Sequence, residues 1–117
     1  MTLGEKQELF MRLLPRLIDK AHELGFDLRG GDLFRDSRLH GQNGEVFESE
    51  GPFTTYASAN SNHKLKCAID LNLFRDGAYL TTTADHMELG MAWEEMNPHC
   101  RWGGHFDDAN HYEIIDT

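Results

Sequence analysis

The sequence contains few cysteines and few prolines. Its two cysteines, Cys67 and Cys100, are too few for a disulfide framework and do not form a C-x-x-C pair. We therefore expect two buried or partly buried thiols in a reducing compartment. Three prolines and a hydrophobic content of 39% indicate a folded chain rather than a disordered one.

Positive charge is also scarce, and long apolar runs are absent. Eleven Lys and Arg residues stand against 20 Asp and Glu, for a formal net charge of −9. Nucleic acid and anionic membrane surfaces are therefore not expected as main partners, because both require clustered positive charge. No stretch approaches the ~20 apolar residues that span a bilayer. The segment MRLLPRLI is short and interrupted by charge, so we expect no signal peptide and a cytoplasmic protein.

The length of 117 residues predicts a single domain over residues 1–117, expected to be a monomer. Such a chain buries roughly two-thirds of its unfolded surface. Apolar residues recur at helical spacing over 4–24, where Pro15 conflicts with a regular helix; we expect one helix, with a bend at Pro15 left open. A second helix is expected over 84–96, with its apolar face formed by Leu89, Ala92, Trp93 and Met96.

Between and after the helices the sequence predicts strands and long loops. Residues 36–60 read as a loop with short strands around 46–47 and 53–56, and 102–110 as a second loop. Strands are expected at 26–35 (interrupted by Gly30–Gly31), 67–74, 78–83 and 111–115. The predicted fold class is α+β, with a small antiparallel sheet that carries a metal site and packs with two to three helices.

The stretch SNHKLKCAIDLNLF places polar residues beside a core strand. Ile69, Leu71 and Leu73 alternate with positions that face away from the core, and Asp70 occupies one of these. His63 precedes Asp70 by seven residues. On one regular strand the two would face opposite sides, so they share a site only if the chain bends between them.

A second group of chemically active residues lies in DDANHYEII. Asp108 precedes His111 by three residues, and His111 shares a strand face with Glu113. Two histidines and a carboxylate form a typical catalytic zinc set with a water in the fourth position. Zinc lowers the pKa of that water and polarises a carbonyl. A further carboxylate must move the proton, and Asp108 is placed for this role.

Both segments resemble motifs of the D-alanyl-D-alanine carboxypeptidase-like zinc peptidases. SNHKLKCAIDL resembles S-x-H-x-x-G-x-A-x-D-L, and WGGHFDDANHYE resembles W-G-G-x-(W/F) followed by D/E-x-x-H-(W/F/Y)-E. The resemblance implies that zinc is bound by His63, Asp70 and His111, and that Asp108 is the catalytic base. It implies a substrate as well, the peptide stem of bacterial peptidoglycan.

Other positions carry over from the same family. The resemblance implies that Arg35 contacts the substrate and the developing oxyanion, a task suited to a permanently charged guanidinium, with Arg38 as its rival. Ser61 matches the motif serine and is a candidate for holding the substrate or the first ligand. Trp102 is expected in the core and is also a candidate for lining the cleft. Lys66 departs from the family pattern, which has glycine there.

Within this family, the W-G-G motif and the small size favour a phage endolysin that cleaves the L-Ala–D-Glu bond. Such an enzyme would reach the cell wall through a membrane lesion made by a partner. A D-Ala-D-Ala carboxypeptidase or dipeptidase with the same site is the alternative. A second alternative is a non-catalytic binding or structural module in which zinc serves only stability.

Ordinary structural roles compete with these assignments. Asp107 is the obvious rival of Asp108, since either can be a simple turn residue. Glu113 is expected to be a solvated strand residue, although a role in supporting a metal ligand is possible. Trp93 is expected in the core. Surface positions are expected for His86, His99 and His105.

Overall fold

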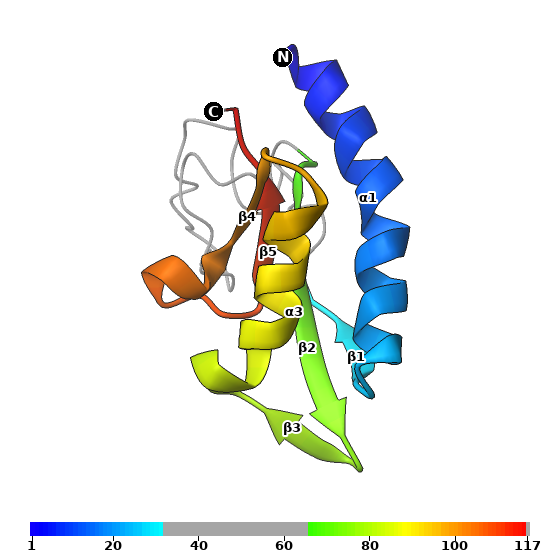
Figure 1. Cartoon of the computed structure of the whole chain (residues 1–117), viewed down its shortest axis with the longest axis vertical. Helices are drawn as coiled ribbons and strands as arrows, with labels where there is room; N and C mark the ends of the chain where they lie inside the picture. Colours follow the sequence, from blue (N-terminus) through cyan, green and yellow to red (C-terminus); the bar gives the residue numbers. More distant parts are fainter. Residues whose placement is uncertain (32–65, 117) are drawn as a thin grey trace, which may run out of the picture.

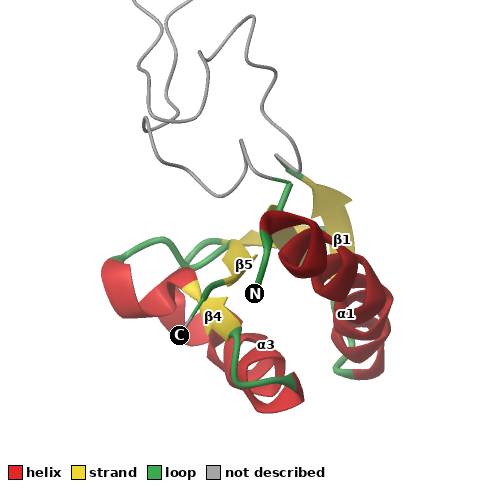
Figure 2. Cartoon of the chain, turned by 90° about the horizontal axis from the view of Figure 1, so that it is seen from above, coloured by secondary structure: helices red, strands yellow, loops and turns green. Residues whose placement is uncertain are grey.

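Two helices lie on one face of a small antiparallel sheet (Figure 1). The computed structural model describes residues 1–31 and 66–116. Helices α1 (Leu3–Glu23) and α3 (Thr83–Met96) contact each other and lie on the same side of the strands (Figure 2). The strands are β1 (Asp27–Gly30), β2 (Ala68–Arg75), β3 (Ala78–Leu80), β4 (Cys100–Trp102) and β5 (His111–Ile114). The predicted α+β class is confirmed.

Helix α1 is continuous through Pro15, so the prediction of one N-terminal helix is confirmed. It begins with a reciprocal cap, in which the Thr2 hydroxyl accepts from the Glu5 N–H and the Glu5 carboxylate accepts from the Thr2 N–H. Gly25 follows the helix with φ 88°, the left-handed conformation that glycine adopts without steric cost. The buried face consists of Phe10, Leu13, Leu14, Leu17 and Ala21.

Strand β3 is shorter than the predicted 78–83, because Thr82 belongs to the next element. The Thr82 hydroxyl accepts from the Asp85 N–H at 3.1 Å, and the Asp85 carboxylate accepts from the Thr82 N–H at 3.2 Å. This capping box begins helix α3 at Thr83. Capping chemistry therefore overrides the β-propensity of the threonine run.

The prediction that His86 lies on the surface is wrong. His86 is 2% exposed, and its ring contacts two strands, β3 and β5. Nε2 lies 3.2 Å from the Leu80 carbonyl oxygen, and Nδ1 lies 3.3 Å from the Tyr112 hydroxyl. Both ring nitrogens thus have partners, and burial lowers the His86 pKa.

Strand β2 is the centre of the sheet, which runs β1-β2-β5-β4 with β3 also paired to β2. β1 and β3 both pair with the second half of β2, so they occupy its opposite edges. β5 pairs with the first half of β2, at residues 68–70. β5 and β3 therefore follow one another along the same edge of β2.

The alternation predicted for β2 is confirmed. Ile69, Leu71 and Leu73 are buried, whereas Asp70 and Asn72 are partly exposed. The apolar face packs into a core that includes Phe10 of α1, Trp93 of α3 and Tyr112 of β5. The opposite face is left for polar side chains, and the candidate site lies there.

A short strand ends where the expected 102–110 loop begins, and one turn of helix lies inside that loop. Cys100–Trp102 forms β4, paired with β5, and Gly103–Phe106 forms one turn of 3₁₀ helix, η1. Both cysteines are buried and unoxidised, as predicted, and burial raises the Cys100 pKa to about 12. Within the described parts of the chain, neither helix has the length and apolar character needed to cross a membrane.

Candidate metal centre

Strand register brings Asp70 and His111 face to face. They are direct partners in the antiparallel pair of β2 and β5. Oδ1 of Asp70 lies 3.4 Å from Nδ1 of His111. Because each side chain projects from a paired strand, the distance between them is set by backbone hydrogen bonding rather than by loop geometry.

Asp108 reaches the same ring nitrogen from the loop after η1. Asp107 ends η1 in the left-handed conformation (φ 60°), which reverses the chain. The Asp108 N–H then donates to the Gly103 carbonyl at 2.9 Å, and the Asp108 carbonyl accepts from the His111 N–H at 3.0 Å. Oδ2 of Asp108 lies 3.8 Å from Nδ1 of His111, and half of the side chain (51%) is exposed.

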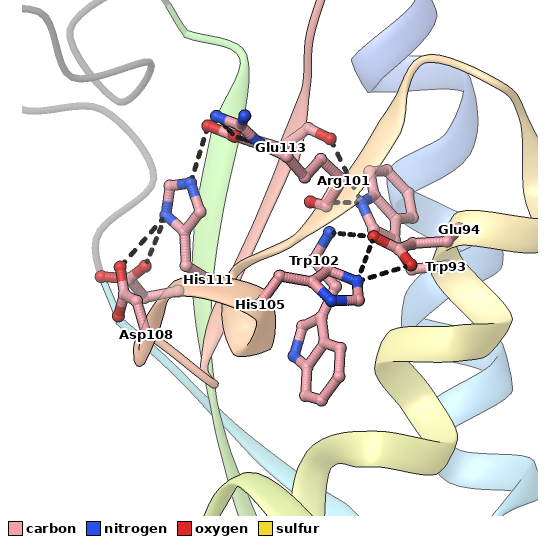
Figure 3. Close-up of polar contacts among 9 residues, drawn as sticks. Trp93, Glu94, Arg101, Trp102, His105, Asp108, His111 and Glu113 are labelled. Carbon is pink, nitrogen blue, oxygen red and sulfur yellow. Dashed lines mark hydrogen bonds and ion pairs between the residues drawn. The ribbon is translucent and has the colours of Figure 1, made fainter.

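These three side chains form a group that could hold a metal ion. One donor atom from each of Asp70, Asp108 and His111 lies within 4.8 Å of the others. Carboxylate oxygen and imidazole nitrogen are zinc donors, and Nδ1 is the His111 nitrogen that faces the two carboxylates. The donor set therefore fits zinc. Figure 3 shows His111 and Asp108 pointing toward each other at this position.

The electrostatics around His111 are strongly negative. Burial alone would lower its pKa, but hydrogen bonds to Asp70 and Glu113, together with the charge of Glu113 and Asp108, raise it to about 9. The carboxylates that stabilise a proton on His111 would also attract a metal cation to the same position, because both carry positive charge.

The prediction that Glu113 is solvated is wrong. Glu113 is 3% exposed, and its Oε1 lies 2.8 Å from Nε2 of His111. The guanidinium of Arg101, on the neighbouring strand β4, binds the other carboxylate oxygen. Strand alternation did predict that His111 and Glu113 share a face, but it could not show that this face is covered.

The two glycines after Trp102 let the loop approach the site closely. A Cβ on Gly103 would overlap the Asp108 carbonyl and lie 2.8 Å from Cβ of His111. A Cβ on Gly104 would overlap the Trp102 indole, which packs against Gly90 of α3 on another side. The two glycines therefore let the chain pack closely against the Trp102 indole and the Asp108 backbone, and this packing sets the position of Asp108.

A hollow of about 250 Å³ opens beside Asp108. It lies where β3 and β5 follow one another along the edge of β2. Asn72 of β2 links two of its lining residues, since its side-chain oxygen accepts from the Tyr79 hydroxyl and from the Asn110 amide, both at 3.2 Å. The hollow is lined by Tyr79, Leu80, Thr81, His86, Asp107, Asp108, Ala109 and Asn110. A ligand in it would touch the candidate catalytic carboxylate.

Two of the three predicted zinc ligands and the predicted base thus meet, while four other predicted positions lie outside the described residues. These are Arg35, Arg38, Ser61 and His63. Their assignments as substrate contacts and as the third ligand stay predictions.

Trp102 is 3% exposed, and its indole N–H donates to the Ala109 carbonyl at 2.7 Å. Such burial makes it a support for the loop, and direct substrate contact stays a prediction that the burial does not favour. His105 turns toward Glu94 of α3, at 2.9 Å, rather than toward His111 (Figure 3). Its expected surface position is confirmed, because it is exposed.

Comparison with known protein families gives a match. The profile of a peptidase family described as D-alanyl-D-alanine carboxypeptidase matches residues 55–114, which is half of the chain. No curated protein shows significant similarity to the sequence. The matched segment contains Asp70, Asp108 and His111, the three residues that the fold brings together. The chain therefore belongs to the D-alanyl-D-alanine carboxypeptidase family of peptidases.

Proposed function

We propose that the protein is a zinc peptidase that cleaves the peptide stem of bacterial peptidoglycan, with the L-Ala–D-Glu bond as its target. The observation that supports this most is the convergence of Asp70 and Asp108 on one nitrogen of His111. In the proposed site Asp70 and His111 hold the zinc together with His63. The third ligand rests on the sequence motif alone.

A bound zinc ion would supply a Lewis acid and lower the pKa of a water molecule in the site. The chain's own carboxylates do the remaining work. Asp70 is mostly covered (16% exposed) and held on a strand, which suits a fixed ligand. Asp108 is half exposed, lies on a loop and borders the hollow, which suits a group that exchanges protons with water and substrate.

In this mechanism Asp108 accepts a proton from the attacking water and delivers it to the nitrogen of the departing amine. Both transfers require one carboxylate that reaches the cleaved bond from the metal side. Arg35, or its rival Arg38, would bind the oxygen of the attacked carbonyl, where negative charge develops. The substrate would lie in the hollow beside Asp108.

The test is digestion of purified peptidoglycan by zinc-loaded protein. We expect Asp108→Ala to reduce the rate at least about a hundredfold, which is the usual contribution of general acid–base catalysis, while zinc content stays the same. Asp107→Asn is the matched control, because asparagine tolerates the left-handed conformation at that position. Full activity in Asp108→Ala, or after removal of zinc by a chelator, would refute the mechanism.

Membership of the D-alanyl-D-alanine carboxypeptidase family favours one alternative, a D-Ala-D-Ala carboxypeptidase with the same site. Mass spectrometry of the digested fragments separates the two. New amino-terminal D-Glu supports the endopeptidase, whereas loss of terminal D-alanine alone supports the carboxypeptidase. If zinc stabilises the fold but no fragment is released, the domain is a non-catalytic module. An endopeptidase of phage origin would act as an endolysin and reach the wall through a lesion made by a partner.

A further inference from the structure

Glu113 is a buried carboxylate whose two oxygens bind different partners. Oε1 accepts from Nε2 of His111, and Oε2 accepts from Nε and Nη2 of Arg101. A buried charge is costly unless such partners compensate it, so a strand position that merely filled space would favour an apolar residue. The arrangement indicates a role tied to the residues that Glu113 contacts (Figure 3).

The first consequence concerns the orientation of the His111 ring. An ionised carboxylate only accepts hydrogen bonds, so the proton between the two side chains must sit on Nε2 of His111. The lone pair of a neutral His111 is then on Nδ1, which lies 3.4 Å from Asp70 and 3.8 Å from Asp108. Glu113 thus selects the tautomer in which the nitrogen at the metal cluster can bind a cation.

The second consequence concerns Arg101. It is the direct partner of Glu113 in the pair of β4 and β5, just as Asp70 is the direct partner of His111 in the pair of β2 and β5. Its guanidinium also lies 5.1 Å from the centre of the Phe106 ring. Phe106 in turn lies 5.9 Å from the His111 ring, edge to face. Arg101 therefore holds the Glu113 carboxylate in place, and that carboxylate in turn orients the His111 ring.

We propose that Arg101 and Glu113 are positioning residues that orient His111 toward the metal cluster. The inference rests on the zinc site of the proposed function, and it assigns the sheet edge β4 a part in that site. Arg101 and Glu113 do not touch the metal or the substrate in this assignment. Their effect reaches the metal only through the direction and tautomer of one imidazole.

The test is zinc affinity at pH 7, measured by competition with a chromophoric chelator. We expect Glu113→Gln to bind zinc 10- to 100-fold more weakly, the range found when the partner of a metal-bound histidine is removed. Arg101→Met should weaken binding in the same direction, and Arg101→Lys should restore part of the loss. Glu94→Gln is the matched control, because Glu94 also binds a histidine and a backbone N–H but does not contact His111.

A second readout distinguishes positioning from plain stability. Long-range ¹H–¹⁵N NMR of the zinc-loaded wild type should show His111 protonated at Nε2 and bound through Nδ1. The proposal is overturned if folded Glu113→Gln binds zinc as tightly as the wild type, or if Nε2 is the bound nitrogen. Wild-type protein that binds zinc through Nδ1 but releases no wall fragments would refute the proposed function and leave this inference intact.

Discussion

Asp70 and His111 are cross-strand partners whose facing atoms, Oδ1 and Nδ1, are 3.4 Å apart. β2 is bonded on both edges, and β5 lies between β2 and β4. The pair is therefore anchored in the interior of the sheet and does not depend on a loop for its geometry. Asp108, by contrast, is placed by a turn that closes against Gly103.

This difference predicts that Asp70 matters for metal binding itself. Asp70→Asn keeps the size of the side chain but removes its charge, so we expect zinc affinity to fall by at least about tenfold, by analogy with the loss of metal ligands or their close partners. Chelator competition measures the change. Asp107→Asn serves again as the control and should bind zinc normally. Equal affinities in the two variants would show that Asp70 is not a ligand.

The raised pKa of His111 predicts how the metal-free protein responds to pH. The folded-state pKa is about 9, above the ordinary value of 6.5, so the protonated ring stabilises the fold. This stabilisation is fully present below pH 6.5 and is lost as pH rises through 9. We expect the free energy of unfolding to fall by on the order of 3 kcal/mol across that window.

Urea denaturation in chelator at pH 6, 7.5 and 9 measures this dependence. The His111→Gln variant has no titrating side chain at this position, so its free energy of unfolding should change little with pH. Any change that it does show measures the contribution of the other titrating groups. A wild-type stability that is flat, or that rises with pH over this range, would contradict the assignment of the charge to His111.

The contact between Gly90 and Trp102 predicts an unusual outcome for a helical glycine. Glycine-to-alanine changes in helices normally stabilise by up to about 1 kcal/mol. At Gly90 the new methyl group would overlap the buried indole, so we expect destabilisation by about 1–3 kcal/mol. Gly4→Ala in α1 is the matched control, since its Cβ would meet only the Thr2 hydroxyl at 3.9 Å. Thermal unfolding of both variants compares them directly.

The parts of this structure that the sequence could predict are those set by local patterns. Alternation in β2 placed Asp70 opposite the core, and it put His111 and Glu113 on one face. The pairing of β2 with β5 joins residues 41 to 45 positions apart, and no local pattern encodes it. The convergence of Asp70 on His111 came instead from the family motifs.

Burial of polar residues was the feature that sequence patterns missed. Glu113 and His86 look like ordinary surface residues in the sequence, yet they are 3% and 2% exposed. Each is buried because partners from other strands or loops, Arg101 for one and Leu80 for the other, satisfy its polar atoms. β4 was missed because three residues between a helix and a glycine pair carry too little periodicity to be recognised.

Lys66 gives the last prediction, because it occupies the position where the resembled motif has glycine. Its φ is 60°, in the left-handed region, immediately before buried Cys67 and strand β2. That conformation costs a non-glycine residue roughly 1–2 kcal/mol, while glycine loses about 0.5–1 kcal/mol in backbone entropy on folding. We therefore expect Lys66→Gly to raise the free energy of unfolding by about 0.5–1 kcal/mol.

Lys66→Ala is the control for this substitution, because it removes the same side-chain interactions and keeps the unfavourable backbone conformation. Urea denaturation should rank the glycine variant above both the alanine variant and the wild type. A glycine variant no more stable than the alanine variant would mean that the turn before β2 relaxes without strain. In that case the motif glycine would serve another purpose, such as close approach of the chain to the site, and not the relief of a left-handed φ.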